Sequence, residues 1–430
     1  MAELPLYDSR QAVPECAVPP LSNAATSAAN KPSRLYSFAL FIGIVGNALS
    51  LFTPISVGLS LKINELVTAS ERVAALGMVS GLGAFVALIA NPFFGRMSDR
   101  TLSRFGRRRP WIVGGALLGF TGLITIAMAS SVYTVGAGWS LAQMGFNAVM
   151  AAMTATVADQ VEKFNRGKMS GIIGMGVPVG MALGAGLSSL FVDIRWMITV
   201  PAVTGITCIF FFALTLKDKP LTERPAPFTL KQLVGTFFFS PREHPDFAWV
   251  CMTKFLFMCA YAAGTGYIAY FLLSELHIEA HKVAGIIFMT LSAAMGGALL
   301  TSPLGGWLSD RYQVRKPFVV VSAIIAMAGL IITGNSDTVP ILVFGQLVLG
   351  LGVGCFNAVD LAMATDTLPD DDNKAKNLGI FNIFATLPQA LIPVMAAPII
   401  ALFGFGALYT SAACVGLAGA LLVFKVKTTN

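Results

Sequence analysis

Charged residues are scarce in this sequence of 430 residues, and their scarcity excludes an ordinary soluble protein. Lys, Arg, Asp and Glu make up 12% of the chain, against about 25% in a typical soluble domain. Hydrophobic residues make up 55%, so the chain is expected to lie in a lipid bilayer. The net charge of +7 does not indicate a nucleic acid partner, because the basic residues lie in short loops between apolar segments.

Cysteine and histidine are also few. The six cysteines are scattered and none forms a CxxC motif, so we expect no disulfide framework, no metal site and no cofactor. The three histidines (His244, His277, His281) lie in loops. With no acid–base cluster inside the apolar segments, a membrane enzyme is a weak alternative. A membrane sensor is equally weak, because the longest polar stretch is too short for a signalling domain.

Apolar runs of about 20 residues predict twelve membrane spans. Their approximate positions are 36–61, 73–94, 111–130, 133–157, 169–191, 196–216, 247–273, 283–308, 318–334, 339–363, 377–401 and 405–424. We therefore expect two six-helix bundles, 35–216 and 247–425. The remaining segments are a disordered cytoplasmic tail at 1–34, a proline-containing cytoplasmic linker at 217–246 and a short cytoplasmic tail at 426–430.

The basic residues predict the orientation of the chain. Twelve spans leave both termini on one side, where 24 Lys and Arg lie, against four (Lys62, Arg72, Arg195, Lys282) on the other side. This bias is typical of cytoplasmic loops. The sequence thus predicts a multi-pass protein of the cytoplasmic (inner) membrane with both termini in the cytoplasm.

Short motifs recur between the two halves at nearly constant offsets. The pairs are Gly95-x-x-Ser98-Asp99-Arg100 with Gly306-x-x-Ser309-Asp310-Arg311, Asn147-Ala148-Val149 with Asn357-Ala358-Val359, and Gly171-Ile172 and Pro178 with Gly379-Ile380 and Pro388. Because each half has six spans, the two copies keep the same orientation. The predicted fold is an all-α membrane protein with twelve transmembrane helices in two parallel six-helix repeats, the major facilitator fold.

The loop from Gly95 to Pro110 places six arginines around Asp99. We expect Gly95 to allow tight packing, and Asp99 to accept hydrogen bonds from a helix N-terminus and from arginine, as a latch between the halves. The expected cytoplasmic gate comprises Gly95, Asp99, Arg100, Arg107, Arg108, Gly306, Asp310 and Arg311. The alternative for the arginines is a purely topological role facing anionic lipid.

These motifs carry a family resemblance. Gly-x-x-x-Asp-Arg followed by Gly-Arg-Arg resembles the loop signature of the major facilitator superfamily. The string from Ser98 to Pro110 is similar to the form found in sucrose/proton symporters and their bacterial relatives, within the glycoside–pentoside–hexuronide symporters. The resemblance implies transport of a sugar-like solute. The second span nevertheless lacks the carboxylates of sodium-coupled members, and the fourth has Gln143, Asn147 and Thr154 where sucrose symporters carry charges.

Two charges lie inside predicted spans, Lys254 in the seventh and Asp360 in the tenth. Helix geometry places both about 10 Å from the cytoplasmic face. A charge facing lipid costs about 2.5–3.5 kcal/mol, so we expect both to face the interior and to pair. Substrate or a proton on Asp360 would then open the pair. The alternatives are a static bridge, or a lysine that reaches the interface.

Helical spacing places polar residues on one face of the first, fourth, seventh and tenth spans, which line the cavity in the family that the chain resembles. The expected lining residues are Asn47, Gln143, Asn147, Tyr261, Thr265, Gln346 and Asn357. Amides suit hydroxyl-rich ligands, and a tyrosine ring suits the face of a sugar. The alternative for each amide is a hydrogen bond between neighbouring helices.

The sequence thus favours a monomeric secondary transporter for a small polar solute, sugar or glycoside, with protons as the coupling ion. Proton-coupled efflux is an alternative, although Gly176 to Gly180 only approximates the fifth-helix motif of drug antiporters. A natural-product or organic-acid carrier also fits these observations.

Overall fold

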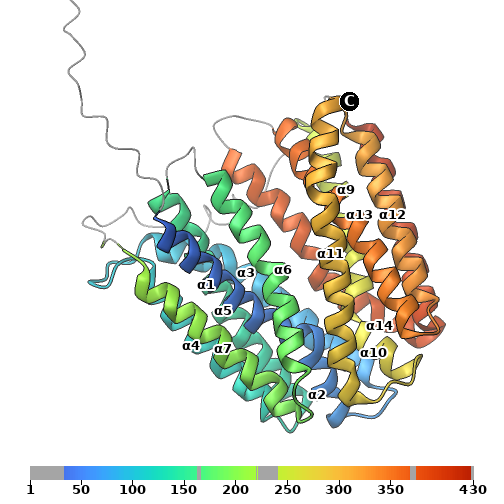
Figure 1. Ribbon diagram of the computed structural model, residues 1–430, viewed down its shortest axis with the longest axis horizontal. Helices are drawn as coiled ribbons and strands as arrows, with labels where there is room; N and C mark the ends of the chain where they lie inside the picture. Colours follow the sequence, from blue (N-terminus) through green and yellow to red (C-terminus); the bar gives the residue numbers. More distant parts are fainter. Residues whose placement is uncertain (1–32, 162–165, 219, 221–240, 369–373, 428–430) are drawn as a thin grey trace, which may run out of the picture.

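The chain folds into long helices arranged in two groups (Figure 1). The computed structural model describes residues 33–161, 166–218, 220, 241–368 and 374–427. The predicted tails at 1–34 and 426–430 and the linker at 217–246 lie largely outside the described residues.

The first group contains α1 (Arg34–Thr53), the π-helical turn η1 (Pro54–Gly58), α2 (Leu59–Leu66), α3 (Arg72–Asp99), α4 (Arg109–Ala127), α5 (Val132–Gln160), α6 (Arg166–Ser188) and α7 (Ile194–Thr215). The second contains α9 (Pro245–Gly266), α10 (Ile268–Ser274), α11 (Ala280–Tyr312), α12 (Lys316–Gly334), α13 (Val339–Asp366), α14 (Lys374–Leu421) and η3 (Leu422–Lys425).

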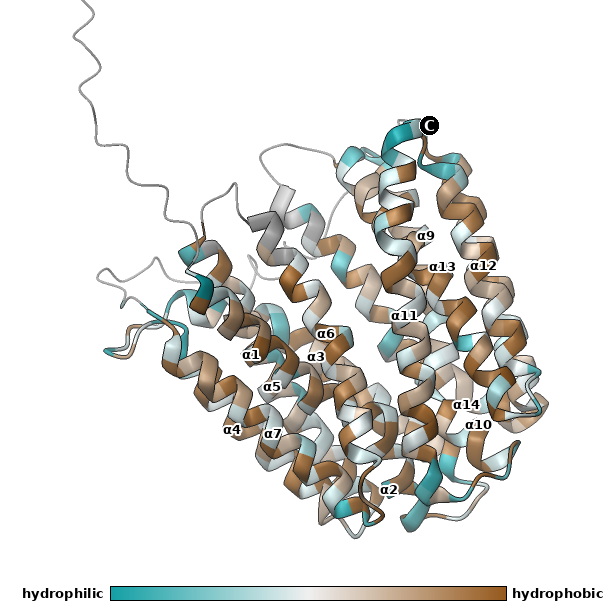
Figure 2. Cartoon of the chain, viewed as in Figure 1, coloured by the Kyte–Doolittle hydropathy of each residue, from teal (hydrophilic) through white to brown (hydrophobic). Residues whose placement is uncertain are grey.

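The helices confirm the prediction of twelve spans. Within the described residues, ten helical segments are long and apolar enough to cross a membrane. The helix α5 adds another, and α14 consists of two helices that meet at Gly404. Gly404 has φ 79° and ψ 177°, a conformation that only glycine adopts readily. Hydrophobic residues cover the lengths of the helices and hydrophilic residues gather at their ends, as Figure 2 shows.

Local sequence signals explain several helix ends. Ser131 begins α5 by accepting a hydrogen bond from the Thr134 backbone N–H at 3.2 Å, as expected of an N-cap serine. Pro110 and Pro317 lie in the first turns of α4 and α12, where a missing N–H has no cost. The two prolines thus mark where the preceding loops end and the helices begin. Both loops lie at one end of the molecule. We call this end, which carries residues 95–110 and 305–317, the arginine-rich end.

The two halves repeat the packing of their third and fourth spans. Gly122 of α4 packs against Gly138 of α5, and Gly329 of α12 packs against Gly345 of α13. Small residues at these crossings let the helix backbones approach closely, as is usual between membrane helices. The same glycine positions therefore build the same crossing twice, and they define the structural register between the halves.

This register corrects one predicted correspondence. Pairing Asn147–Val149 with Asn357–Val359 requires a larger offset along the chain than the one that relates the two glycine crossings. In the structural register Asn147 corresponds to Gly354, and Asn357 corresponds to Met150. The shared tripeptide is therefore a coincidence, and Asn357 has no amide counterpart in the first half.

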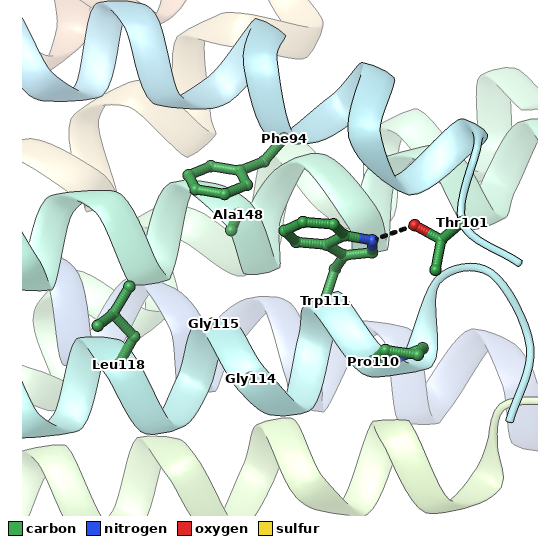
Figure 3. A pocket seen from close by; sticks show the side chains of 8 residues that line it. All are labelled: Phe94, Thr101, Pro110, Trp111, Gly114, Gly115, Leu118 and Ala148. Carbon is green, nitrogen blue, oxygen red and sulfur yellow. Dashed lines mark hydrogen bonds between the residues drawn. The ribbon is translucent and has the colours of Figure 1, made fainter. Parts of the chain in front are cut away.

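The outer surface of the first half contains a pocket near the arginine-rich end (Figure 3). It lies among α3, α4 and α5 and has a volume of about 470 Å³. Its lining is apolar, with Phe94, Trp111 and Leu118 among its side chains. All of its lining residues belong to the first half.

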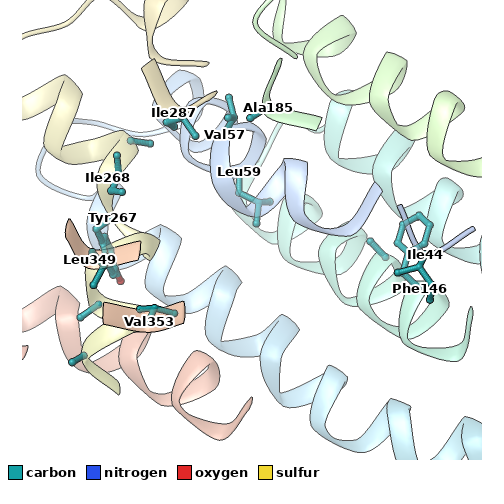
Figure 4. Close-up of a cluster of buried hydrophobic side chains, with 14 of the residues drawn as sticks. Ile44, Val57, Leu59, Phe146, Ala185, Tyr267, Ile268, Ile287, Leu349 and Val353 are labelled. Atoms are coloured by element: carbon teal, nitrogen blue, oxygen red, sulfur yellow. The ribbon is translucent and has the colours of Figure 1, made fainter. Parts of the chain in front are cut away.

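The two halves meet near the end opposite the arginine-rich end. Buried apolar side chains from both halves gather there, and Figure 4 shows their positions. They are Val57, Leu59, Ala185, Ile268 and Ile287. Gly77 of α3 also lies close to Pro393 of α14, because a Cβ at Gly77 would come 2.6 Å from the Pro393 carbonyl oxygen. From this contact the two groups of helices diverge toward the arginine-rich end (Figure 1).

Candidate functional site

Two charged side chains meet inside the second half, as the sequence predicts. Lys254 Nζ of α9 lies 3.0 Å from Asp360 Oδ2 of α13. The Lys254 side chain is 8% exposed and that of Asp360 is 0% exposed. Each charge would be costly alone at this depth, so the pair compensates both charges.

The surroundings hold the lysine more firmly than the aspartate. Lys254 Nζ also donates a hydrogen bond to Asn357 Oδ1 at 2.8 Å. The rings of Phe356 and Phe381 each lie 5.4 Å from Nζ, which stabilises an ammonium group. Among the described residues, no donor makes a well-directed hydrogen bond to either oxygen of Asp360. The carboxylate therefore depends on Lys254 alone.

The ion pair lies at the edge of the buried interior. Asp360 is fully buried, whereas Asn357, one turn earlier on the same helix, is exposed. Because Asn357 contacts the ammonium group directly, a solute that binds Asn357 would also lie next to Lys254. The arrangement thus connects an accessible amide to a buried charge.

The other predicted lining residues fall into separate places. Tyr261 and Thr265 are half-buried on α9, and the Thr265 hydroxyl donates to the Tyr261 carbonyl oxygen at 3.0 Å. In the first half, Asn147 Nδ2 donates to Gln143 Oε1 at 2.9 Å. Asn47 of α1 is buried. The structure therefore brings Lys254, Asp360 and Asn357 together, and Gln143 with Asn147.

Gln346 occupies a different position from the predicted one. It is 1% exposed, and its Nε2 donates to Thr333 Oγ1 of α12 at 3.2 Å. For each amide, the alternative to lining the cavity was a hydrogen bond between neighbouring helices. Gln346 makes such a hydrogen bond. Gln346 therefore stabilises the contact of α12 with α13 instead of lining a cavity.

At the arginine-rich end, the buried Arg108 is the centre of an ion-pair network in the first half. It forms ion pairs with Asp99 at the end of α3 and with Asp159 at the end of α5, the latter at 2.9 Å from Nε. Its guanidinium also donates to Ser98 Oγ at 2.6 Å. Burial alone would lower the pKa of Arg108, but Asp159 and Asp99 outweigh burial and raise it. Arg107 pairs with Asp159 as well.

The second half repeats this network around Arg315. Its guanidinium pairs with Asp310, and with Asp366 at 3.3 Å from Nε. It also donates to Ser309 Oγ at 3.0 Å. In the structural register Arg315 is the counterpart of Arg108 and Asp366 that of Asp159, so the network is part of the repeat.

The start of the connection between the halves also contacts this loop. Asp218 Oδ2 accepts hydrogen bonds from the backbone N–H groups of Arg108 and Arg109, at 2.6 and 2.8 Å. Gly106 has φ 97°, and a side chain there would meet Asp218. Asp218 thus caps the first turn of α4, where a negative charge is stabilising.

Sequence reasoning missed Asp159, Arg315, Asp366 and Asp218 as members of these networks. An acidic residue at a helix end is common at a membrane surface, so none stood out singly. The signal that could have found Asp159, Arg315 and Asp366 is the identical offset along the chain of Arg108 from Arg315 and of Asp159 from Asp366, and no such offset marks Asp218. Neither Asp99 nor Asp310 has an ion pair with the opposite half among the described residues.

The remaining predicted gate residues lie at the same end. A Cβ at Gly95 would lie 3.8 Å from that of Ala151, and one at Gly306 would lie 3.8 Å from that of Ala358. These are ordinary contacts, so the tight packing predicted at Gly95 is wrong in this conformation.

The arginines that follow the two aspartates differ in their contacts. The Arg311 guanidinium lies 5.2 Å from the centre of the Trp307 ring. Arg100 ends α3, where its N–H donates to the Met97 carbonyl oxygen at 3.2 Å. Both therefore remain at the helix ends beside the loops.

Solved structures share this architecture. The human organic anion transporter MFSD10 (TETRAN) has a TM-score of 0.64 and 17% identity, covering 91% of this chain and 99% of that one. The nucleoside transporter NupG has a TM-score of 0.72 and 14% identity, with the same coverage. A bacterial homolog of the human lysosomal transporter Spinster, inward-facing and occupied, has a TM-score of 0.67 and 13% identity, covering 91% and 94%. At such identities the likeness concerns the fold alone.

Sequence comparison adds a curated relative and a family. The multidrug resistance protein MdtL of Escherichia coli O139:H28 (strain E24377A / ETEC) is 30% identical over 146 residues. The match covers 34% of this chain and 36% of MdtL, about a third of each. The family described as the Major Facilitator Superfamily matches residues 35–299 and 279–430. These matches span both halves, and the chain therefore belongs to the major facilitator superfamily.

Proposed function

We propose that this protein is a proton-coupled secondary transporter that moves a small polar solute across the cytoplasmic membrane. The observation that carries the proposal is the Lys254–Asp360 pair, which lies inside the second half beside the exposed amide of Asn357. A structural ion pair does not need an accessible polar neighbour, whereas a coupling site does.

Proton coupling follows from the unequal support of the two charges. Asp360 relies on Lys254, while Lys254 has additional contacts with Asn357 and two rings. A proton on Asp360 removes the main attraction between α9 and α13 at this point. Lys254 then keeps Asn357 as its partner and becomes free to contact the solute, which links proton binding to solute binding.

Alternating access is proposed as a rocking of 35–216 against 247–425, with the protein acting as a monomer. The excess of basic residues assigns the arginine-rich end and both termini to the cytoplasm. Because the halves touch at the opposite end, the present conformation is open toward the cytoplasm. Closing that side would bring the Asp99 and Asp310 loops toward the facing half, where they act as the gate.

A sugar or glycoside is the proposed solute class. Asn357, Tyr261 and Thr265 lie on α13 and α9 with amide, phenol and hydroxyl groups, which suit a hydroxyl-rich ligand. The loop string from Ser98 to Pro110 supports a place near the glycoside–pentoside–hexuronide symporters. Proton-coupled efflux is the second candidate, because MdtL, named a multidrug resistance protein, matches 34% of the chain.

Proteoliposomes containing the purified full-length chain test this proposal. Sugars, glycosides, organic acids and cationic drugs are supplied with and without a pH gradient. We expect accumulation of a sugar-like solute only with an inward proton gradient. Drug extrusion with no sugar uptake would favour the efflux alternative, and no gradient-dependent movement of any solute would reject proton coupling.

The gate yields a separate prediction. Asp99→Asn weakens the pair with Arg108, and we expect solute turnover to slow several-fold, with solute binding unchanged. Asp99 is 52% exposed, so little loss of stability is expected. Initial rates in proteoliposomes and equilibrium solute binding in detergent measure the two effects.

The matched control for Asp99→Asn is Glu279→Gln, which changes an exposed carboxylate in the loop before α11. Lys282 and His281 hold the pKa of Glu279 below its ordinary value, but both of its ion pairs lie at exposed positions and contribute little. Normal turnover of Asp99→Asn, or equal slowing by Glu279→Gln, would contradict the gating role.

A further inference from the structure

The pocket among α3, α4 and α5 is well defined and apolar. The rings of Phe94 and Trp111 are in contact, with centres 5.4 Å apart and planes tilted by 51°, and Leu118 and Ala148 also line the pocket (Figure 3). The indole N–H of Trp111 donates to Thr101 Oγ1 at 2.6 Å. Polar groups therefore lie only at the side nearest the arginine-rich loop.

The pocket opens on the outer face of the helices. Gly114 is exposed, and a Cβ at this position would meet nothing within 4 Å. Large apolar side chains of α3 and α4 that are close in sequence to the lining residues are exposed as well, namely Phe93, Met97 and Leu117. In a membrane protein such side chains contact acyl chains, so the opening faces lipid.

The loop at the polar side of the pocket carries an excess of positive charge. Residues 95–110 contain six arginines and one aspartate, and Asp159 and Asp218 add two carboxylates in contact with the loop. Arg104 is exposed and lies between exposed Leu102 and Phe105. Apolar side chains next to arginine at a helix end place this loop at the level of the lipid headgroups.

We propose that this pocket binds one acyl chain of an anionic phospholipid, whose headgroup lies against the arginine-rich loop near Arg104. An apolar chamber that opens to lipid fits an acyl chain, and the adjoining positive charge selects an anionic headgroup over a zwitterionic one. The site belongs to the first half. In the structural register, Val321 stands where Gly114 leaves space, and Phe318 replaces Trp111.

The fluorescence of Trp111 reports on the occupant. The full-length protein is placed in nanodiscs containing phosphatidylcholine or phosphatidylglycerol brominated in one acyl chain, and the Trp111 contribution is obtained by subtracting the Trp111→Phe variant. We expect brominated phosphatidylglycerol to quench Trp111 with about fivefold preference over brominated phosphatidylcholine, as one arginine near an anionic lipid allows. The preference should fall as salt is raised.

Two variants separate the two parts of the site. Gly114 lines the pocket and a Cβ there meets nothing within 4 Å, so we expect Gly114→Leu to occupy the pocket and to abolish the preferential quenching. Arg104→Gln, at an exposed position, should lower the preference for phosphatidylglycerol while leaving quenching by phosphatidylcholine unchanged. A third arm adds a brominated apolar drug-like solute to nanodiscs of unbrominated lipid.

Equal quenching of wild-type Trp111 by both lipids would overturn the proposal, because it would indicate only general lipid contact. An unchanged preference in Gly114→Leu would place the lipid elsewhere. Strong quenching by the drug-like solute, without any lipid preference, would identify the pocket as a solute site instead. Wild-type preference that Gly114→Leu removes and Arg104→Gln lowers supports the proposal.

Discussion

Asp360→Asn is expected to abolish uptake driven by an inward pH gradient, while solute exchange across the membrane continues. Asparagine keeps the shape of the side chain but cannot take up or release the proton, so the gradient has no group on which to act. The measurement is radiolabelled solute uptake into proteoliposomes with a pH gradient, compared with exchange against internal solute without one. Uptake should fall to the level of protein-free liposomes.

Asp337→Asn is the matched control, because Asp337 is an exposed aspartate in the loop before α13. It should leave both uptake and exchange unchanged. Undiminished gradient-driven uptake by Asp360→Asn would remove the coupling role from Asp360. Loss of exchange together with uptake would instead assign Asp360 to the movement of the halves or to solute binding.

The ion pair could be predicted from sequence because membrane physics leaves few alternatives. Two isolated charges at the same depth on helices of one half must each be compensated, and the nearest opposite charge is the natural partner. The twelve spans were predictable for the same reason, since apolar length determines them. The break between the last two spans follows from Gly404, which permits a conformation that other residues avoid.

The partners of the arginines could not be predicted with the same ease. Six arginines near one aspartate indicate an ion-pair network. They do not show that Asp159, in the last turn of α5, completes this network. Tertiary packing of α3, α4 and α5 decides that contact. Gln346 illustrates the same limit, because its spacing matched a cavity-facing stripe while Thr333 on a neighbouring helix provided a nearer partner.

The incorrect repeat register has a related cause. Asn147 and Asn357 begin an identical tripeptide, whereas the structural register depends on small residues, some of which differ in type between the halves. Gly145 packs near Gly119, and its counterpart Gly352 packs near Ala326. Close approach of backbones requires only that the side chains be small, so the same crossing tolerates a change from glycine to alanine.

Lys254→Met is expected to destabilise the protein by about 3–5 kcal/mol, because it leaves the Asp360 carboxylate buried and unpaired. Asp360→Asn should cost less, since the Lys254 ammonium keeps Asn357 and two aromatic rings as partners. The double variant Lys254→Met/Asp360→Asn should recover most of the loss, because no uncompensated charge remains. Thermal unfolding of the four detergent-purified proteins measures these differences as a double-mutant cycle.

The asymmetry between the two single variants distinguishes a charged pair from a neutral one. If Asp360 carried a proton in this conformation, removing Lys254 would strand no charge, and Lys254→Met would then be nearly as stable as the wild type. The exchanged pair Lys254→Asp/Asp360→Lys adds a second test, since it restores opposite charges and should regain part of the stability that either neutralisation loses. Lys282→Met controls for the loss of a lysine, because Lys282 is 58% exposed and its pair with Glu279 contributes little. A large cost for Lys254→Met, together with recovery in the double variant, therefore requires that Asp360 be ionised and paired before the proton arrives.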